Sequence, residues 1–152
     1  MLKLLDEAYK SKTWHGPNLR GSLRGVTAVA AVWRPNPKRH NIWEITLHAA
    51  YWKYAVRRRL CGDKRGSFPI KGSNWFVLPA DANKAEWKAH LRLLDEMHRS
   101  LRDAIADMSP ARLFTKVPGS KYTAAELIYG VACHDVYHAG QIQLLKRLLK
   151  AR

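Results

Sequence analysis

Three histidines fall on the apolar stripes of two expected helices, where a polar ring needs a partner. In the last helix-length segment, apolar residues recur every three or four positions, and His134 and His138 lie four apart in the middle of that seam. His48 interrupts the inward stripe of an earlier segment in the same way. Imidazole is a common ligand of divalent metals, and a metal gives each buried ring a partner and fixes its orientation. If the two helices are neighbours, the three rings would converge on one ion.

Such a ligand set points to catalytic metal chemistry. Three neutral imidazoles leave the +2 charge uncompensated and leave a coordination position open for water or substrate. A metal in this setting lowers the pKa of a bound water or stabilises a thiolate, so the ligands alone do not choose between hydrolysis and thiol transfer. The simpler alternative is that a side chain or a water satisfies each ring. A lone inward histidine usually has such a partner, but three of them on two stripes favour the metal.

Residues beside the histidines have weaker claims to a chemical role. Asp135 invites comparison with the general base of HExxH metalloproteases, but it is one methylene shorter and points about 100° away from His134 around a helix. We therefore expect a structural role for it. Gln141 would either bond the second ring nitrogen of a ligand or close the helix interface. We expect Trp52 to form a core or pocket wall and Cys133 to be a small buried hydrophobe.

The other four histidines lack this coincidence of spacing. His15 and His40 lie beside Gly or Asn at helix starts and are expected in loops or caps, whereas His90 and His98 are expected on the polar face or boundary of the third helix. None of the four is assigned to the site.

Four helix-length segments, divided by proline and glycine, must position these residues. None of them alternates like a strand, so we predict an all-α four-helix bundle that forms a single domain over residues 1–152. The first helix is expected over 4–14 and again over 19–33. The second, third and fourth helices are expected over 41–60, 82–108 and 123–150. A long, ordered, aromatic loop over 68–81 is expected to lie on the core between the second and third helices.

Composition limits the partners of the chain. Its 152 residues hold 27 Lys and Arg against 12 Asp and Glu, a net charge of +15 that attracts nucleic acid, acidic membranes or anionic substrates. The charge is spread along the chain, as on a solvated surface, and no helix-turn-helix, zinc-finger or RNA-binding signature accompanies it. No apolar run is long enough to span a bilayer, so we expect a soluble, cytoplasmic protein. The two cysteines show no metal-binding spacing.

Three stretches of the chain also resemble a known family. HGPNLRGSL, RHNIWEITLHAAYWKYAVRRRLCGD and HDVYHAGQIQLLKRLL occur in order, and HxIWExxxHxxxW and HDxYHxGQI are the specific pieces. They resemble the DinB-like (DinB/YfiT) family of metal-dependent enzymes over nearly the whole chain. The resemblance implies a four-helix bundle, usually a homodimer, with nickel or zinc held by His48, His134 and His138.

The resemblance also bears on the reaction. Related proteins with a comparable metal centre are S-transferases or isomerases that use low-molecular-weight thiols, while many others have no assigned reaction. We therefore expect a small-molecule substrate and a thiol S-transferase or hydrolase. Two alternatives stay open: a basic nucleic-acid-binding module, motivated by the net charge, and a metal-stabilised helical scaffold without catalysis. The net charge of +15 is higher than the resemblance leads us to expect.

Overall fold

Three long helices carry the fold, and a capping box begins each of them. The computed structural model describes residues 1–64, 66, 68–72, 74–78 and 83–151. In each box the N-cap side chain accepts a backbone N–H while the glutamate three positions later bonds back to the N-cap, which satisfies donors that the first turn leaves free. The caps are Asn41, Asn83 and Thr123, and the helices are α4 (Ile42–Cys61), α5 (Lys84–Ala106) and α6 (Ala124–Lys150).

The N-terminal third is less regular than the sequence pattern predicted. In place of helices over 4–14 and 19–33 it forms three short ones: α1 (Leu2–Tyr9), α2 (Leu19–Ser22) and α3 (Ala28–Val32). The prediction over 19–33 was wrong because Asn18 and Thr27 each cap a new helix. Between them Gly25 turns the chain with a φ of 75°, a left-handed conformation that glycine adopts without strain.

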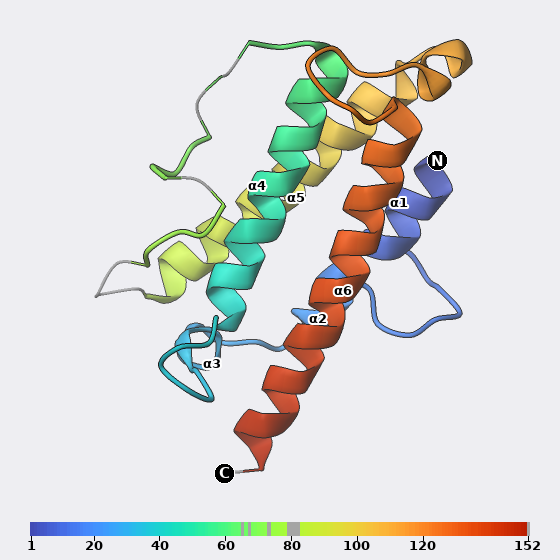
Figure 1. Ribbon diagram of the computed structural model, residues 1–152. Coiled ribbons are helices and arrows are strands. Elements are labelled where there is room, and N and C mark those ends of the chain that lie inside the picture. Colours follow the sequence, from blue (N-terminus) through green and yellow to red (C-terminus); the bar gives the residue numbers. More distant parts are fainter. Residues whose placement is uncertain (65, 67, 73, 79–82, 152) are drawn as a thin grey trace.

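The long helices lie side by side, with the N-terminal helices against them. Figure 1 shows α4 alongside α6, α5 behind α4, and α1 at the flank of α6. A 3₁₀ helix, η1 (Pro110–Phe114), lies in the connection from α5 to α6. The described part of the chain contains no β-strand, and an isolated bridge joins Lys116 to Thr123. The predicted all-α class is therefore confirmed, with α1, α4, α5 and α6 packed together.

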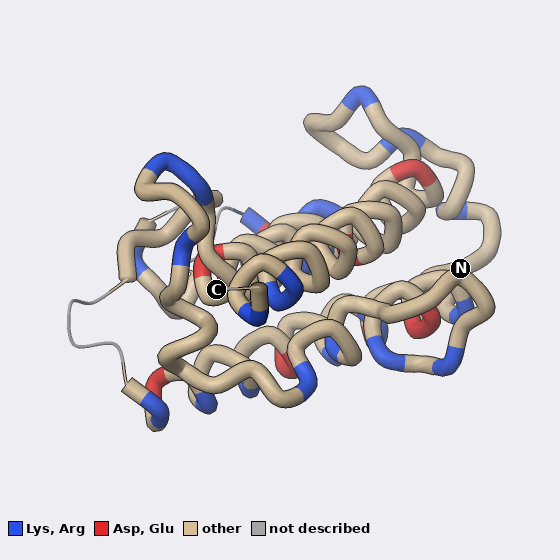
Figure 2. Tube along the Cα trace, turned by 90° about the horizontal axis from the view of Figure 1, so that it is seen from below, with Lys and Arg blue, Asp and Glu red and all other residues tan. Residues whose placement is uncertain are grey.

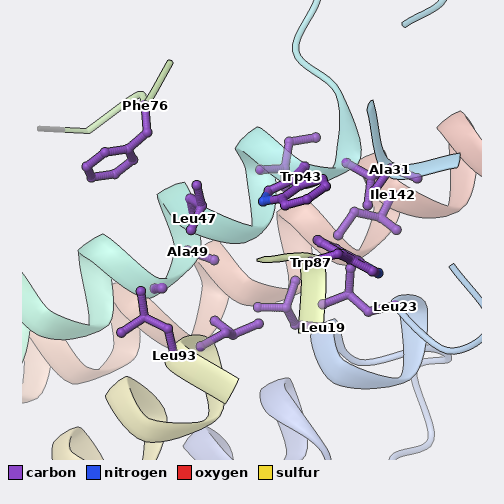
Figure 3. Close-up of a cluster of buried hydrophobic side chains, with 14 of the residues drawn as sticks. Leu19, Leu23, Ala31, Trp43, Leu47, Ala49, Phe76, Trp87, Leu93 and Ile142 are labelled. Atoms are coloured by element: carbon purple, nitrogen blue, oxygen red, sulfur yellow. The ribbon is translucent and has the colours of Figure 1, made fainter. Parts of the chain in front are cut away.

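Two apolar clusters fill the interior. In the larger one, Trp43 from α4 packs on Trp87 from α5, with ring centroids 5.1 Å apart, and Ile142 of α6 lies in the same cluster (Figure 3). Phe76 joins this cluster from the segment between α4 and α5, so the described part of the predicted loop does pack on the core. The smaller cluster, which includes Leu101 and Ile128, combines side chains of α1, α4, α5 and α6.

The surface is strongly basic. Figure 2 shows Lys and Arg distributed over most of the elements, with few Asp and Glu between them. No helix in the described ranges is both long enough and apolar enough to cross a membrane.

Candidate metal centre

The three histidines on the inward stripes meet between α4 and α6. The Nε2 atom of His134 lies 3.0 Å from Nε2 of His48 and 3.0 Å from Nε2 of His138. One ligand atom from each ring falls within a group no more than 4.8 Å across. His48 and His138 are only 6% and 3% exposed, respectively. The structure therefore brings together the trio that the sequence pattern selected.

Hydrogen bonds fix which nitrogen of two of the rings carries a proton. His48 donates from Nδ1 to the backbone carbonyl of Asn74, at 2.9 Å, and His138 donates from Nδ1 to Oε1 of Gln141, at 2.7 Å. A carbonyl oxygen can only accept a hydrogen bond, so Nδ1 of each of these rings carries the proton. In the neutral ring, Nε2 then carries a free lone pair. One proton on His134 Nε2 cannot satisfy both lone pairs.

A cation would satisfy this arrangement. Three imidazole lone pairs directed at one point, with the far nitrogens of two rings held by carbonyl oxygens, are the donor set and the outer support that divalent metals find in proteins. The group of residues therefore fits a divalent ion. Gln141 takes the first of its two expected roles, and its own Nε2 donates to the hydroxyl of Tyr137 at 3.0 Å.

The electrostatics of the centre keep the rings neutral. Burial, reinforced by the neighbouring histidines, lowers the pKa of His134 to about 3 and that of His138 to about 4. Burial also lowers the pKa of His48. A histidine must be neutral to ligate a metal, so these pKa shifts leave the trio ready to bind at neutral pH.

A second set of residues holds His48 from the side of the loop, and the sequence analysis missed it. Asn74 has a φ of 61°, and while its backbone carbonyl faces His48, its side chain accepts the indole N–H of Trp52 at 2.9 Å. Trp75 is stacked between two imidazoles, 3.9 Å from the centroid of His48 and 3.5 Å from that of His40. His40 lies in the loop before α4, as expected, but it is also part of the surroundings of the centre.

Glu44 anchors this outer layer to α4. It accepts hydrogen bonds from Arg34 at 2.8 and 2.5 Å, and His40 lies 3.1 Å from the same carboxylate. Burial alone would raise the pKa of Glu44, but the hydrogen bonds from Arg34, Asn41 and His40 outweigh it and lower that pKa. The capping glutamate of α4 thus also positions the ring that covers Trp75.

A buried ion pair lies directly beside the centre. Lys53 of α4 and Asp135 of α6 are both 0% exposed and bonded to each other, and the ammonium group also lies 4.8 Å from the ring centroid of Tyr9. Burial raises the pKa of the Asp135 carboxyl, and Lys53 opposes that rise. The pair joins the two helices that carry the histidines, which agrees with the structural role expected for Asp135.

Two cavities reach the centre. His48, His134 and His138 all line a cavity of about 610 Å³, whose apolar wall includes Ile45 and Leu145. Its polar lining includes Arg39 and Tyr137, and none of the described residues that line it is Asp or Glu. His134 also lines a second cavity of about 580 Å³, where Trp52 forms the wall that was expected of it. Small molecules commonly bind in cavities of this size.

Three of the secondary predictions were wrong. Cys133 is exposed and not a buried hydrophobe, because it lies off the seam of α6. His98, expected on the polar face or boundary of the third helix, is 0% exposed and stacks on Tyr9, because α1 packs against α5 there. Leu148 continues the three-and-four apolar spacing that predicts the inward seam of α6, but it is 42% exposed.

Comparisons with known proteins give one result. A family model described as the DinB superfamily matches residues 13–142, which include all three histidines and most of the bundle. Neither the search of curated proteins nor that of solved structures returned a match. Because the family match covers well over half of the chain, the protein belongs to the DinB superfamily.

Proposed function

We propose that this protein is a metal-dependent enzyme in which His48, His134 and His138 hold a divalent ion, nickel or zinc, and that it transfers a low-molecular-weight thiol to a small electrophile. The observation that carries the proposal is the convergence of three Nε2 atoms, with His134 3.0 Å from each of the other two. When bound, the ion would supply Lewis-acid activation and leave an open position for one further ligand.

The lining of the cavity favours thiol transfer over hydrolysis. A hydrolytic site usually has a carboxylate or another base to take the proton of water, and the described lining of the cavity that all three histidines share contains no Asp or Glu. Glu126 lines only the second cavity, which reaches His134 but neither of the other two histidines. A free thiol ordinarily has a pKa near 8.5, so it needs far less help than water to become a nucleophile at neutral pH. The same lining would also accept an amphipathic substrate, since Arg39 can meet an anionic group while Ile45 and Leu145 contact an apolar one.

The residues around the trio would act mainly by orientation. Asn74 and Trp75 hold the ring of His48, and Gln141 holds that of His138, so the lone pairs of these two rings keep their directions as substrate enters. The hydroxyl of Tyr137 lines the cavity and is already bonded to Gln141, which places a polar group next to the entering substrate.

The test is metal content followed by thiol transfer. Protein purified without a polyhistidine tag is analysed for metals as wild type, as His134→Ala and as the control His15→Ala, which changes an exposed histidine in a loop. We expect about one equivalent of nickel or zinc in the wild type and the control and a near-complete loss in His134→Ala. A His134→Ala protein that folds and keeps its full metal content would refute the assignment.

Activity is measured as the conjugation of a low-molecular-weight thiol to a chromogenic electrophile. The wild type should lose the reaction on chelation and regain it when metal is added back. Wild type that binds metal in the trio but shows neither conjugation nor ester hydrolysis would support the non-catalytic scaffold instead.

A further inference from the structure

A basic cavity is lined mainly by residues near the N-terminus and by α5. It shares no lining residue with the two cavities of the metal centre. It has a volume of about 840 Å³ and is bordered by the end of α1, the segment that follows it, α2 and one face of α5. Five cationic side chains line it: Lys10, Lys12, Arg20, Arg24 and Arg99. Arg20 is paired with Asp95, and none of the other four forms an ion pair with another described residue.

The carboxylate in this lining does not neutralise those four charges. Asp95 is held by Arg20, whose Nε lies 3.0 Å from Oδ1 of the carboxylate. Asp95 also accepts a hydrogen bond from the hydroxyl group of Tyr9. Its negative charge is therefore already matched within the protein. The unmatched cations give the cavity a field that attracts anions.

The floor of the cavity contains a buried polar ring that lacks a partner. His98 is 0% exposed, it lines the cavity, and neither of its ring nitrogens makes a hydrogen bond to a described residue. The nearest acid, Asp6, lies 3.5 Å from Nε2 but accepts hydrogen bonds from Arg102 instead. Buried polar groups without partners are rare because they lose their hydration, so this unpaired ring is a polar group beneath the cavity that a bound ligand could satisfy once the atoms that cover it shift.

The wall formed by the segment after α1 is held in place by hydrogen bonds. The side chain of Asn18 donates to the carbonyl of Ser11 at 2.8 Å and accepts from the backbone N–H of Gly21 at 2.8 Å. This cross-link ties the segment that carries Lys12 to α2, which carries Arg20. The cationic groups are thus mounted on a framework that is formed before any ligand arrives, which limits the ordering needed on binding.

We propose that this cavity binds a small phosphorylated molecule. Phosphate groups are multiply charged acceptors, and Arg and Lys are the side chains that recognise them. The volume of about 840 Å³ is that of a small-molecule site. A nucleic acid would instead need cations arranged along an extended surface. His98 would donate or accept one further hydrogen bond at the floor.

The experiment titrates inorganic pyrophosphate into the full-length protein by calorimetry at constant ionic strength. The cavity variant is Lys12→Gln/Arg24→Gln/Arg99→Gln. The matched control, Lys84→Gln/Lys88→Gln/Arg147→Gln, removes the same number of positive charges from exposed positions outside the cavity. We expect one site per chain in the wild type, at least about a tenfold weaker Kd in the cavity variant and less than about a twofold change in the control.

A third variant separates a built site from general charge attraction. His98→Phe keeps the net charge and the flat ring but removes both ring nitrogens, so it should weaken pyrophosphate binding several-fold if the floor contacts the ligand. Circular dichroism confirms that each variant is folded.

Three results would overturn the proposal. The first is a wild type that does not bind pyrophosphate. The second is equal weakening in the cavity variant and the control, with His98→Phe unchanged. The third is a duplex oligonucleotide that binds the wild type and the cavity variant equally well and is not displaced by pyrophosphate. None of these results depends on whether the metal centre is catalytic.

Discussion

The ion pair between Lys53 and Asp135 gives the sharpest test of how the two helices of the metal centre are held together. Both side chains are fully buried, one on α4 and one on α6. Burial raises the pKa of the Asp135 carboxyl even with the ammonium group beside it. In Lys53→Met the carboxyl loses that group, and we expect it to take up a proton at neutral pH.

The size of the effect follows from this proton. In the unfolded chain the carboxyl has an ordinary pKa of about 3.9, and each pH unit above it adds about 1.4 kcal/mol to the free energy of keeping the group protonated. Because the wild-type carboxyl already carries part of this cost, Lys53→Met should lose at most about 4 kcal/mol of unfolding free energy at pH 7, the range measured when one partner of a buried pair is removed. Since the folded pKa is raised above the unfolded value, the loss should shrink as the pH falls and be at most about 1.5 kcal/mol at pH 5.

Urea unfolding of chelator-treated protein at pH 7 and pH 5 measures both values without metal binding. Lys53→Met/Asp135→Leu removes the whole pair and should stay within about 2 kcal/mol of the wild type at either pH, because no lone charge is left buried. Lys88→Met, an exposed change on α5, should stay within about 0.5 kcal/mol. A loss below 1 kcal/mol in Lys53→Met at pH 7, or a loss that does not change with pH, would refute the reasoning.

Three further predictions test other parts of the fold. Burial, helped by Lys53, Lys10 and Arg102, lowers the pKa of His98 to about 2, so its contribution to stability is present above the unfolded pKa of about 6.5 and is lost as the pH falls. Urea unfolding should show a loss of about 2 kcal/mol between pH 7 and pH 5 that His98→Phe lacks. Gln141→Leu removes the acceptor of His138 Nδ1 and should weaken metal binding by about 10- to 100-fold in a chelator competition, with little change in melting temperature. Gly62→Ala, at a φ of 70° and with open space around the new Cβ, should lower the unfolding free energy by roughly 1 kcal/mol through backbone strain alone.

The sequence predicted the long helices and the histidine trio because both depend on local periodicity. The three and four spacing of α6 puts His134 and His138 on one face, and the capping residues at Asn41 and Thr123 mark where α4 and α6 begin. Any bundle that packs the stripe of α4 against the stripe of α6 brings His48 toward the other two. One signal was overlooked: Lys53 lies four residues after Ala49 and three before Val56, on the inward stripe of α4, and a charge there needs an opposite charge on a neighbouring helix.

The rest of the centre could not be predicted because it depends on tertiary contacts, which the spacing of apolar residues along the sequence does not reveal. Asn74 lies 26 positions after His48, and its carbonyl reaches the ring through a left-handed turn within an irregular segment. Trp75 is fixed by stacking on both of its faces. The sequence does not distinguish it from the other aromatic residues of the segment, because stacking is a tertiary contact. The burial of His98 likewise results from the position of α1, which the broken N-terminal pattern left undetermined.

These differences divide the centre into two layers with different origins. The three histidines are carried by helices whose faces are set by the spacing of apolar residues, so a substitution of one of them acts on the lone pairs directly. The orientation of the rings is set by groups from a loop and by a glutamine at the next turn of α6, so a substitution there should leave the fold and the ligand set intact and change only how firmly the rings are held. The proposed reactivity should therefore vary more with the segment around Asn74 and Trp75 than with the core, because that segment holds His48 and Trp75 lines the cavity that all three histidines share.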